Sequence, residues 1–403
     1  MYDLIVVGGG ASGLFAAITS KENASHQKIL ILEKTNKLLS KVALSGGGRC
    51  NLTHACFDPF TLAQYYPRGK QELIGPFHTF QPKDTLSWFE QRKVPLQTEN
   101  DGRIFPLSNT SETIVMTLIS EAKKTGIEIL LNQDIENITR KENYFSLSRK
   151  DKPLFTKHLL LATGSSPEGY RWAKSLNHSI QQPIPSLFAF HIPSFPFLDC
   201  SGISIDVEAS IANTSFSQRG SLLITHFGCS GPAIMALSSR SARYLYEKNY
   251  KSNLEINFLP SFSEKEIFEK LLWHKTNSSK KTLVTENPFS ISKNLWEALI
   301  ENVKINPKKT LQEYSNKDFH ILCERLHKSS YAIEGKAPQK GEFVTCGGVS
   351  LSEIDWKTMQ SKICKGLFFA GEILDVDGLT GGFNLQNAWT TGYIAGKSSA
   401  LLS

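Results

Sequence analysis

The sequence predicts an α/β protein: a Rossmann-like dinucleotide-binding domain interrupted by a large inserted domain that is β-rich in one part and helical in the other. A short apolar run, Leu4–Val7, passes directly into the glycine-rich stretch Gly8–Gly13 and then into a helix-forming segment. A second strand–turn–helix pattern lies over residues 366–395. The 403 residues exceed one ordinary core, so two or three domains are expected.

The glycines at the first turn have the GxGxxG spacing of a dinucleotide site. Gly8 permits the tight turn, Gly10 lets a pyrophosphate approach the backbone, and Gly13 lets helix and strand pack closely. Ala11 and Ser12 begin the helix, whose free N–H groups and positive dipole end suit phosphates. The alternative is a glycine-rich turn that serves only the packing of the helix on the strand. The strand before the turn and the acid described next favour the dinucleotide site.

The second apolar run, Ile29–Leu32, ends at an acid. Glu33 stands at the distance expected for a carboxylate that accepts hydrogen bonds from both hydroxyls of an adenosine ribose. The same negative charge would repel a 2′-phosphate. Lys34 and Lys41 follow on the way to the next glycine-rich segment.

That segment is Ser45–Asn51, with the sequence SGGGRCN. A nicotinamide dehydrogenase has no standard need for such a loop here. A two-dinucleotide-binding-domain flavoprotein has one, because its chain passes along the extended FAD. The glycines at 46–48 would let the backbone lie against the flavin or the pyrophosphate. Arg49 and Asn51 suit phosphate, carbonyl or substrate contacts.

Two later parts of the chain support FAD over NAD. Ala162–Gly164 ends an apolar strand with the ATG pattern common in flavoproteins. Gly366–Glu372 is a strand that ends in a glycine and an acid, and Asp377–Asn384 is a glycine-rich turn before the helix Leu385–Ala395. The N-terminus of such a helix stabilises negative charge at N1 and O2 of a reduced flavin.

Two residues are candidates for acid–base chemistry. Cys50 is either a small buried residue that supports its loop, or a thiol near the reactive flavin face that acts as an acid or lines the substrate pocket. His226, in the stretch THFGCSGP, is either an acid–base group on the substrate side or a residue that caps or orients its turn.

The predicted domains are 1–185 and 341–403 for the FAD-binding domain and 186–340 for the insertion. The insertion divides into a β-rich part, 186–262, and a helical part, 263–330. Several lysines gather in the helical part: Lys275, Lys280, Lys281, Lys304, Lys308 and Lys309. A solvated helix face is the ordinary explanation for them, and contact with a polyanion is the alternative.

Composition excludes several classes of protein. The seven cysteines form no CxxC pair, which argues against a disulfide scaffold, a zinc ribbon and a dithiol reductase, and favours a reducing cytoplasm. No metal site is predicted. No window approaches the run of about 18 apolar residues that a membrane span needs, and the N-terminus lacks the features of a signal peptide. The net charge of +7 permits an anionic partner.

The chain resembles the bacterial aminoacetone-oxidase-like FAD-binding proteins, often described as NAD(P)/FAD-dependent oxidoreductases. The matching stretches run from one end to the other: GGGASG, KVALSGGGRCNLT, ITHFGCSGPAIMALS, VTCGGVSLSEI with TMQSK, and GLFFAGEILDVDGLTGGFNLQNAWTTGYIAG. The resemblance implies non-covalent FAD and a discontinuous flavin domain around an insertion. One departure is Gly164–Tyr170, where the family has a longer loop ending in GDGY.

From the motifs and the resemblance together, the residues predicted to bind FAD are Gly8, Gly10, Ala11, Ser12, Gly13, Glu33, Lys34, Lys41, Ser45, Gly46, Gly47, Gly48, Arg49, Cys50, Asn51, Ile135, Ala162, Thr163, Gly164, Gly371, Glu372, Asp377, Gly381, Gly382, Phe383 and Asn384.

The predicted activity is hydride transfer through flavin N5 to a substrate held between the two domains, with NAD(P)H as a transient electron donor because no second nicotinamide-binding fold is visible. Activities in the resembling family include oxidation of small amino-ketones, reduction of enones and, in one branch, reduction of a uridine in large-subunit ribosomal RNA to dihydrouridine. The basic balance and the lysines favour the RNA substrate slightly over a small amine, ketone or enone. A non-catalytic FAD-binding redox sensor or RNA or ribosome assembly factor is the alternative from another class.

Overall fold

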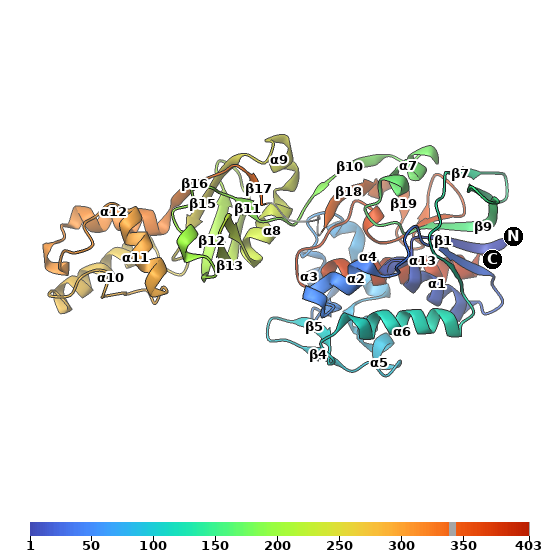
Figure 1. Cartoon of the computed structure of the whole chain (residues 1–403), viewed down its shortest axis with the longest axis horizontal. Helices are drawn as coiled ribbons and strands as arrows, with labels where there is room; N and C mark the ends of the chain where they lie inside the picture. The colour runs from blue at the N-terminus through green and yellow to red at the C-terminus, as the bar shows by residue number, and fades with distance from the viewer. Residues whose placement is uncertain (338–343, 403) are drawn as a thin grey trace. The chain divides into compact units, whose positions relative to one another are not determined.

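The computed structural model describes residues 1–337 and 344–402, and the chain divides into two compact units. Unit 1 comprises Met1–Pro183 and Thr345–Ser403, and unit 2 comprises Ile184–Val344. The chain therefore leaves unit 1, forms unit 2 and returns (Figure 1). The predicted boundary at 185/186 lies two residues from the observed one, and that at 340/341 falls outside the described residues.

A parallel sheet forms the centre of unit 1 and confirms the predicted α/β class (Figure 1). Its middle strands follow the order β21-β9-β1-β2-β6, with every neighbour pair parallel. Strand β2 is the continuous buried run ILIL, as expected for a strand covered on both faces. The strands of this sheet are β1 (Tyr2–Val7), β2 (Ile29–Leu32), β6 (Glu128–Leu130), β7 (Asn137–Arg140), β8 (Phe145–Ser148), β9 (Leu154–Leu161), β19 (Ile354–Asp355), β20 (Gln360–Ser361) and β21 (Leu367–Phe369).

Helices and two small sheets complete unit 1. The helices are α1 (Ala11–Asn23), α2 (Ser40–Leu44), α3 (Pro59–Ala63), α4 (Lys70–Thr79), α5 (Pro82–Glu90), α6 (Ser111–Lys124), α7 (Pro167–Ser175) and α13 (Phe383–Leu401), with short 3-10 turns η1 (Ser45–Gly48), η4 (Leu351–Glu353) and η5 (Gly371–Ile373). One small sheet contains β3 (Thr53–His54), β5 (Arg103–Pro106) and β4 (Leu96–Thr98). The other pairs β18 (Thr345–Val349) with β10 (Ile180–Pro185), whose last two residues already belong to unit 2.

Helices α1 and α13 pack against each other at very short range. A Cβ on Gly392 would lie 2.7 Å from the backbone oxygen of Ser12, and one on Gly396 would lie 2.2 Å from that of Ala16. Because both contacts advance by four residues along each helix, the two helices run parallel. Glycine is needed at both positions because the backbone of the other helix occupies the place of any side chain.

Unit 2 is built on an antiparallel sheet in the order β16-β15-β12-β13-β14-β11-β17. Its strands are β11 (Phe190–His191), β12 (Ser204–Ile211), β13 (Ser217–Thr225), β14 (Gly228–Ser230), β15 (Ser252–Asn257), β16 (Ser329–Ile333) and β17 (Gly335–Lys336). Its helices are α8 (Pro232–Arg240), α9 (Ala242–Glu247), α10 (Glu264–Asn277), α11 (Lys293–Asn302) and α12 (Asn316–His327), with 3-10 turns η2 (Leu198–Cys200) and η3 (Leu311–Glu313).

One apolar core holds the sheet and the helices of unit 2 together. It contains Val207 from β12 as well as Leu271, Trp296 and Leu322 from α10, α11 and α12. The helices begin where their sequences dictate: α10 starts after Ser263, whose hydroxyl and the carboxylate of Glu266 form a capping box. The β-rich and helical parts of the insertion therefore share a single core.

The contact between α1 and α13 predicts an unusual response to a helix-favouring substitution. Gly396→Ala should lower the free energy of unfolding by about 1–3 kcal/mol, because its methyl group would force the two helices apart. Gly75→Ala in α4 is the matched control, since a Cβ there meets no atom within 4 Å and alanine is the better helix former. Chemical unfolding followed by circular dichroism measures both, and equal stability of Gly396→Ala and the unmodified protein would contradict the close packing.

Candidate functional site: a dinucleotide cradle in unit 1

The three glycines of the first turn have three different surroundings. A Cβ on Gly8, whose φ is +112°, would lie 2.3 Å from the backbone oxygen of Ala162 at the end of β9. A Cβ on Gly13 would lie 2.0 Å from the oxygen of Gly8, so this glycine lets α1 pack on the turn. A Cβ on Gly10 would meet nothing within 4 Å. The backbone at Gly10 thus faces open space at the N-terminus of α1, as a phosphate site requires.

Glu33 lies beside this turn. Its Oε2 accepts a hydrogen bond from the backbone N–H of Gly9 at 2.8 Å, and its Oε1 accepts from the N–H and the hydroxyl of Thr35, each at 2.8 Å. The carboxylate is therefore held in one orientation next to the glycine turn, where it can still accept a bond from a ribose hydroxyl. Ile135, predicted to contact the cofactor, is buried and follows β6, the strand next to β2.

The two lysines after β2 form ion pairs with segments that follow β9 and β21. Lys34 Nζ lies 2.6 Å from Glu168 Oε1 in α7. The bonds from Lys34 and Ser166 lower the pKa of Glu168 to about 2. Lys41 pairs with Glu372 and also donates to Ser165 Oγ at 3.2 Å. Both lysines lie at the surface, so these pairs are accessible to an anionic ligand.

The loop Ser45–Gly48 has a backbone that only glycine adopts readily. The φ angles of Gly46, Gly47 and Gly48 are +58°, +68° and +85°. A Cβ on Gly46 would lie 2.7 Å from the backbone nitrogen of Asn51, whereas Cβ atoms on Gly47 and Gly48 would meet nothing within 4 Å. The first glycine therefore closes the loop on itself, and the other two present bare backbone to open space.

The residues after the glycines anchor this loop. Arg49 donates to Asn109 Oδ1 at 3.0 Å and to Glu99 Oε1 at 2.5 Å, with its guanidinium 4.0 Å from the ring centre of Phe105. Arg49 is thus tied to the small sheet β3-β5-β4. Cys50 has no exposed surface, and burial raises the pKa of its thiol to about 12.

Asn51 joins the loop to the N-terminus of α13. With its amide oxygen turned toward Gly382, that oxygen accepts from the N–H of Gly382 at 3.0 Å, and its amide nitrogen donates to the oxygen of Thr53 at 3.2 Å. A Cβ on Gly382 would lie 2.6 Å from that same oxygen, so the backbones touch here. Helix α13 begins at the next residue, Phe383, and its positive dipole end lies beside the loop.

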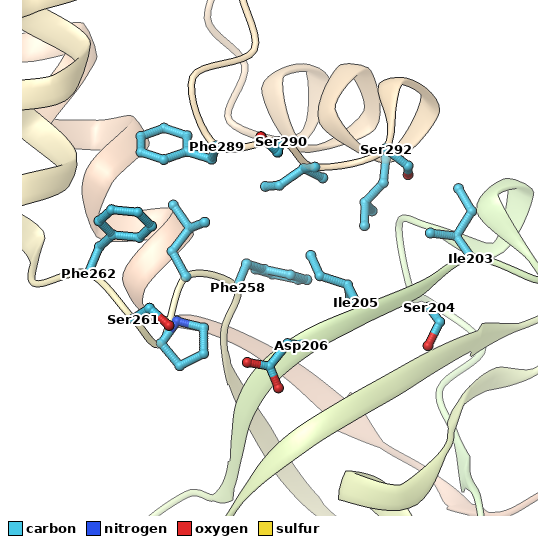
Figure 2. Close-up of a pocket in the computed structure, with 14 residues that line it drawn as sticks. Ile203, Ser204, Ile205, Asp206, Phe258, Ser261, Phe262, Phe289, Ser290 and Ser292 are labelled. Carbon is cyan, nitrogen blue, oxygen red and sulfur yellow. The ribbon is translucent and has the colours of Figure 1, made fainter. Parts of the chain in front are cut away.

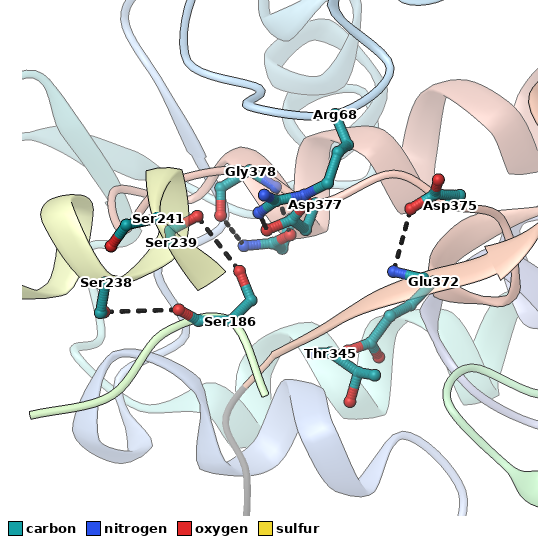
Figure 3. Close-up of polar contacts among 12 residues, drawn as sticks. Arg68, Ser186, Ser238, Ser239, Ser241, Thr345, Glu372, Asp375, Asp377 and Gly378 are labelled. Carbon is teal, nitrogen blue, oxygen red and sulfur yellow. Dashed lines mark hydrogen bonds and ion pairs between the residues drawn. The ribbon is translucent and has the colours of Figure 1, made fainter. Parts of the chain in front are cut away.

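Two residues predicted to bind FAD also hold the turn before α13. Asp377 has no exposed surface and accepts two hydrogen bonds from the Arg68 guanidinium in a bidentate ion pair (Figure 3). Asn384 donates to the oxygen of Gly378 at 2.7 Å and accepts from its N–H at 2.8 Å. Nothing in the sequence indicated Arg68, because its partner lies 309 residues away.

Aromatic rings stack over the same turn. The ring of Phe383 lies 4.2 Å from that of Tyr65 and 4.8 Å from that of His54, both in stacked geometry. Gly381, with a φ of +129°, allows this, since its Cβ would lie 2.7 Å from the Phe383 ring. Burial lowers the pKa of His54, which favours the neutral imidazole. Sequence reasoning missed Tyr65 and His54, because neither belongs to a recognisable motif.

The shortened loop after β9 places polar atoms without partners near the glycine turn. The hydroxyls of Thr163 and Tyr170 are buried and form no hydrogen bond with the residues that the structure describes. Gly164 has a φ of +59°, and its Cβ would lie 3.6 Å from Glu372 Oε2. Gly371 donates its N–H to Thr391 Oγ1 of α13 at 2.9 Å. Buried hydroxyls without protein partners are expected where a polar ligand supplies the missing hydrogen bonds.

His226 belongs to unit 2. It lies exposed in the two-residue turn between β13 and β14, and its ring packs edge-on against Phe227 at 4.9 Å. The sequence predicted a strand-to-helix turn here. The chain instead forms this hairpin first, and α8 follows with Pro232 as its first residue.

Unit 2 also contains a pocket of about 310 Å³ between β12 and the start of α11 (Figure 2). Its walls combine apolar residues, such as Ile205, Phe258 and Phe289, with several serines and Asp206. Asp206 at its rim is held by Arg219 at 3.2 Å. Neither glycine-rich turn contributes to it, so it is separate from the dinucleotide cradle.

The described residues fit FAD. They provide open backbone at Gly10, Gly47 and Gly48, an oriented acid at Glu33, and two helices whose N-termini face the glycine-rich segments. In residues 1–337 and 344–402 no three or more His, Cys, Asp or Glu side chains are grouped to hold a metal ion. Within the same ranges, no helix combines the length and the apolar character needed to cross a membrane.

Curated relatives align with almost the whole chain. The chain is 27% identical to the ribosomal RNA dihydrouridine synthase of Escherichia coli over 99% of both proteins. It is 29% identical to the protein of that name from Haemophilus influenzae, over 98% of this chain and 97% of that protein. It is 26% identical to the 3-dehydro-bile acid delta(4,6)-reductase of Clostridium scindens, over 98% of both.

Solved structures share the fold at low identity. The FrdA chain of E. coli quinol fumarate reductase matches with a TM-score of 0.52 and 15% identity, over 99% of this chain and 70% of that one. A 3-ketosteroid-delta4-(5alpha)-dehydrogenase from Rhodococcus jostii matches with a TM-score of 0.51 and 13% identity, over 99% and 96%. The family match given next, the curated relatives and the cofactor cradle together make this protein an FAD-dependent oxidoreductase, as its sequence resemblance predicted. The model of the HI0933-like protein Rossmann domain matches residues 2–398, and the chain belongs to this HI0933-like family of FAD-binding proteins.

Proposed function

We propose that this oxidoreductase adds two hydrogens to a carbon–carbon double bond next to a carbonyl, and that its substrate is a uridine of large-subunit ribosomal RNA. The names of the curated relatives support the reaction: a dihydrouridine synthase and a delta(4,6)-reductase both saturate such a bond. Reduction of a ribosomal uridine and reduction of a bile acid differ in the size and charge of the substrate. The positive charge on the surface of unit 2 favours RNA.

The observation that carries the RNA assignment is a lysine cluster formed by two segments of unit 2. An antiparallel bridge joins Thr282 to Thr310, and the N–H of Leu311 donates to the oxygen of Lys281 at 2.8 Å. These contacts gather four lysines, hereafter the lysine cluster: Lys280, Lys281, Lys308 and Lys309. Of the four, Lys281 also pairs with Glu286 at 2.7 Å. A concentration of cations of this kind suits a phosphate backbone.

The residues of unit 1 have separate tasks in this proposal. FAD, when bound, supplies the hydride from its N5 atom. The bare backbone at Gly10 and the N-terminus of α1 hold phosphates, and Glu33 orients the ribose. The N-terminus of α13 stabilises negative charge close to it. We assign Cys50 a supporting role in its loop, because a thiol without exposed surface and with a raised pKa is a poor proton donor.

NAD(P)H is the proposed electron donor, binding transiently. All seven cysteines have free thiols, which supports the proposed reducing, cytoplasmic compartment. The second candidate substrate is a small conjugated enone such as a steroid. The bile acid reductase, which aligns over 98% of this chain, favours it.

Mass spectrometry of ribosomal RNA separates the two candidates. Ribosomal RNA from cells with the gene should contain a dihydrouridine at one position where RNA from cells that lack the gene contains uridine. The cloned gene should restore the dihydrouridine. A Gly10→Leu gene should fail to restore it, because the encoded protein should not hold FAD. Identical RNA with and without the gene would refute the RNA substrate and direct the search to enones.

The first prediction from the proposed function concerns the cofactor. The purified protein should be yellow and should release FAD on denaturation, since no covalent attachment is expected. Gly10→Leu should fold normally but lose FAD, because its side chain would fill the open space at the N-terminus of α1. Gly335→Leu in unit 2, whose Cβ also meets nothing within 4 Å, should keep FAD. Absorbance at flavin wavelengths measures both, and a flavin-loaded Gly10→Leu protein would contradict the cradle.

A second prediction concerns RNA. Replacing the four members of the lysine cluster with glutamate should weaken RNA binding and flatten its dependence on salt, because fewer counterions are released. The FAD content should not change. The matched control reverses four other exposed lysines of unit 2, namely Lys248, Lys251, Lys265 and Lys293. Fluorescence anisotropy of a labelled RNA at several salt concentrations gives both slopes, and equal losses in the two variants would mean that net charge alone matters.

A third prediction concerns the proton donor. Cys50→Ala should keep FAD and reduce a uridine-containing RNA at nearly the normal rate, because its buried thiol cannot contact the substrate. His226→Gln should keep FAD reduction normal and slow RNA reduction by a factor on the order of 10²–10⁴ if this exposed imidazole donates the proton. Rapid-mixing absorbance follows the two half-reactions separately. A large loss in Cys50→Ala with FAD retained would return the catalytic role to the thiol.

A further inference from the structure

Trp273 is an exposed aromatic residue on α10. Its side chain is 59% exposed, whereas the other five tryptophans of the chain are buried or partly buried. The apolar face of α10 contains Ile267 and Leu271, which are fully buried in the core of unit 2. Trp273 lies about 200° around the helix from Leu271, so it points away from that core. Packing therefore gives no reason for an indole at this position.

The other residues around Trp273 already have partners. Phe268 stacks on His320 with ring centres 4.1 Å apart, and Lys275 Nζ donates to the oxygen of Tyr314 at 2.6 Å. Two acids of α10 are engaged as well, since the carboxylate of Glu266 caps the helix and that of Glu269 lies 3.7 Å from Lys265. The ring of Trp273 lies edge-on to that of the neighbouring His274, with the ring centres 4.8 Å apart, and much of the indole stays open to solvent.

The lysine cluster lies just past the end of the same helix. Helix α10 ends at Asn277, and the chain turns there, with the N–H of Lys281 bonded to the oxygen of Ser278 at 2.9 Å. The N–H of Gln312 bonds to the oxygen of Ser279 at 3.2 Å, which attaches the second lysine-bearing segment to this turn. The cluster therefore begins only seven residues after Trp273.

The acids at the cluster are also occupied. Glu286 accepts from Lys281 and from Ser278, and lies 2.7 Å from His274 Nδ1. Glu313 accepts from the N–H and the hydroxyl of Thr310, each at 2.7 Å. Both carboxylates keep their negative charge, so the four lysines face two acids and the cluster retains a net positive charge that a polyanion can approach.

We propose that Trp273 and the lysine cluster form a binding surface for unpaired RNA, in which the indole stacks on a base and the lysines contact the adjoining phosphates. An exposed aromatic ring beside cations is the arrangement that proteins use for single strands, where stacking contributes about 1–3 kcal/mol per base. The bases of a duplex are stacked on one another and offer no free face to an indole. The inference rests on the proposed function and adds to it that the RNA segment held here is single-stranded.

The test measures binding of labelled oligonucleotides to the FAD-loaded full chain by fluorescence anisotropy. Trp273→Ala should weaken binding of a uridine-rich single strand by about 5- to 150-fold, the equivalent of one stacked base. The slope of affinity against salt should stay unchanged, because no charge is removed. Trp273→Phe should restore most of the affinity, and binding of a duplex of the same length should not respond to either variant.

Two further variants make the result specific. Tyr246→Ala removes another exposed aromatic ring of unit 2, which is 39% exposed on α9, and should leave RNA binding unchanged. The reversed lysine cluster should lower both the affinity and the salt slope. Unchanged FAD absorbance and circular dichroism establish that each variant is folded.

The outcomes are distinct. Normal single-strand affinity of Trp273→Ala, or an equal loss for single strand and duplex, would overturn the stacking role. Equal binding of polyglutamate and RNA would overturn the assignment to RNA. A selective loss in Trp273→Ala supports the binding surface even if ribosomal RNA from cells lacking the gene keeps its dihydrouridine. That second result would refute the ribosomal uridine as the substrate, but not the binding of single-stranded RNA at this surface.

Discussion

The close parallel contact between α1 and α13 is the constraint on which the cofactor site depends. Ser12 is the second residue of α1, and Gly392, which it meets, is the tenth of α13. The N-terminus of α13 therefore extends eight residues, or about 12 Å, beyond that of α1 in the same direction. Two positive helix ends are thus staggered within one unit. This spacing suits a cofactor that carries phosphates at one place and a ring able to accept negative charge at another.

The turns around this helix pair are fixed by a few polar contacts between distant parts of the chain. Asn51 ties the SGGGRCN loop to Gly382, and Arg68 holds Asp377 in a buried bidentate pair. Removal of Arg68 would leave a buried charge without its partner, which is far more costly than the loss of a surface pair. The glycine-rich loops therefore keep one conformation while their backbone stays exposed, because neighbouring residues bind them on both sides.

The local parts of this site could be predicted from the sequence, and the distant contacts could not. The roles of Gly8, Gly10 and Gly13 follow from their spacing between a strand and a helix, and the structure surrounds each glycine accordingly. Motif membership alone could not reveal that Asp377 serves an ion pair, because its partner is set by tertiary contacts. The exposure of Trp273 was equally hidden, since a helical pattern of apolar residues does not tell which one faces water.

The dependence of the first helix on the thirteenth has a consequence for how the protein is made. Helix α1 ends at Asn23 and α13 begins at Phe383, so 359 residues separate the two halves of the contact. At usual rates of translation, α1 emerges from the ribosome on the order of 20 to 70 s before its partner helix exists. The buried face of α1 is without this partner helix during that interval. Retention of flavin then becomes a property of completed chains, and a nascent or truncated chain would stay colourless.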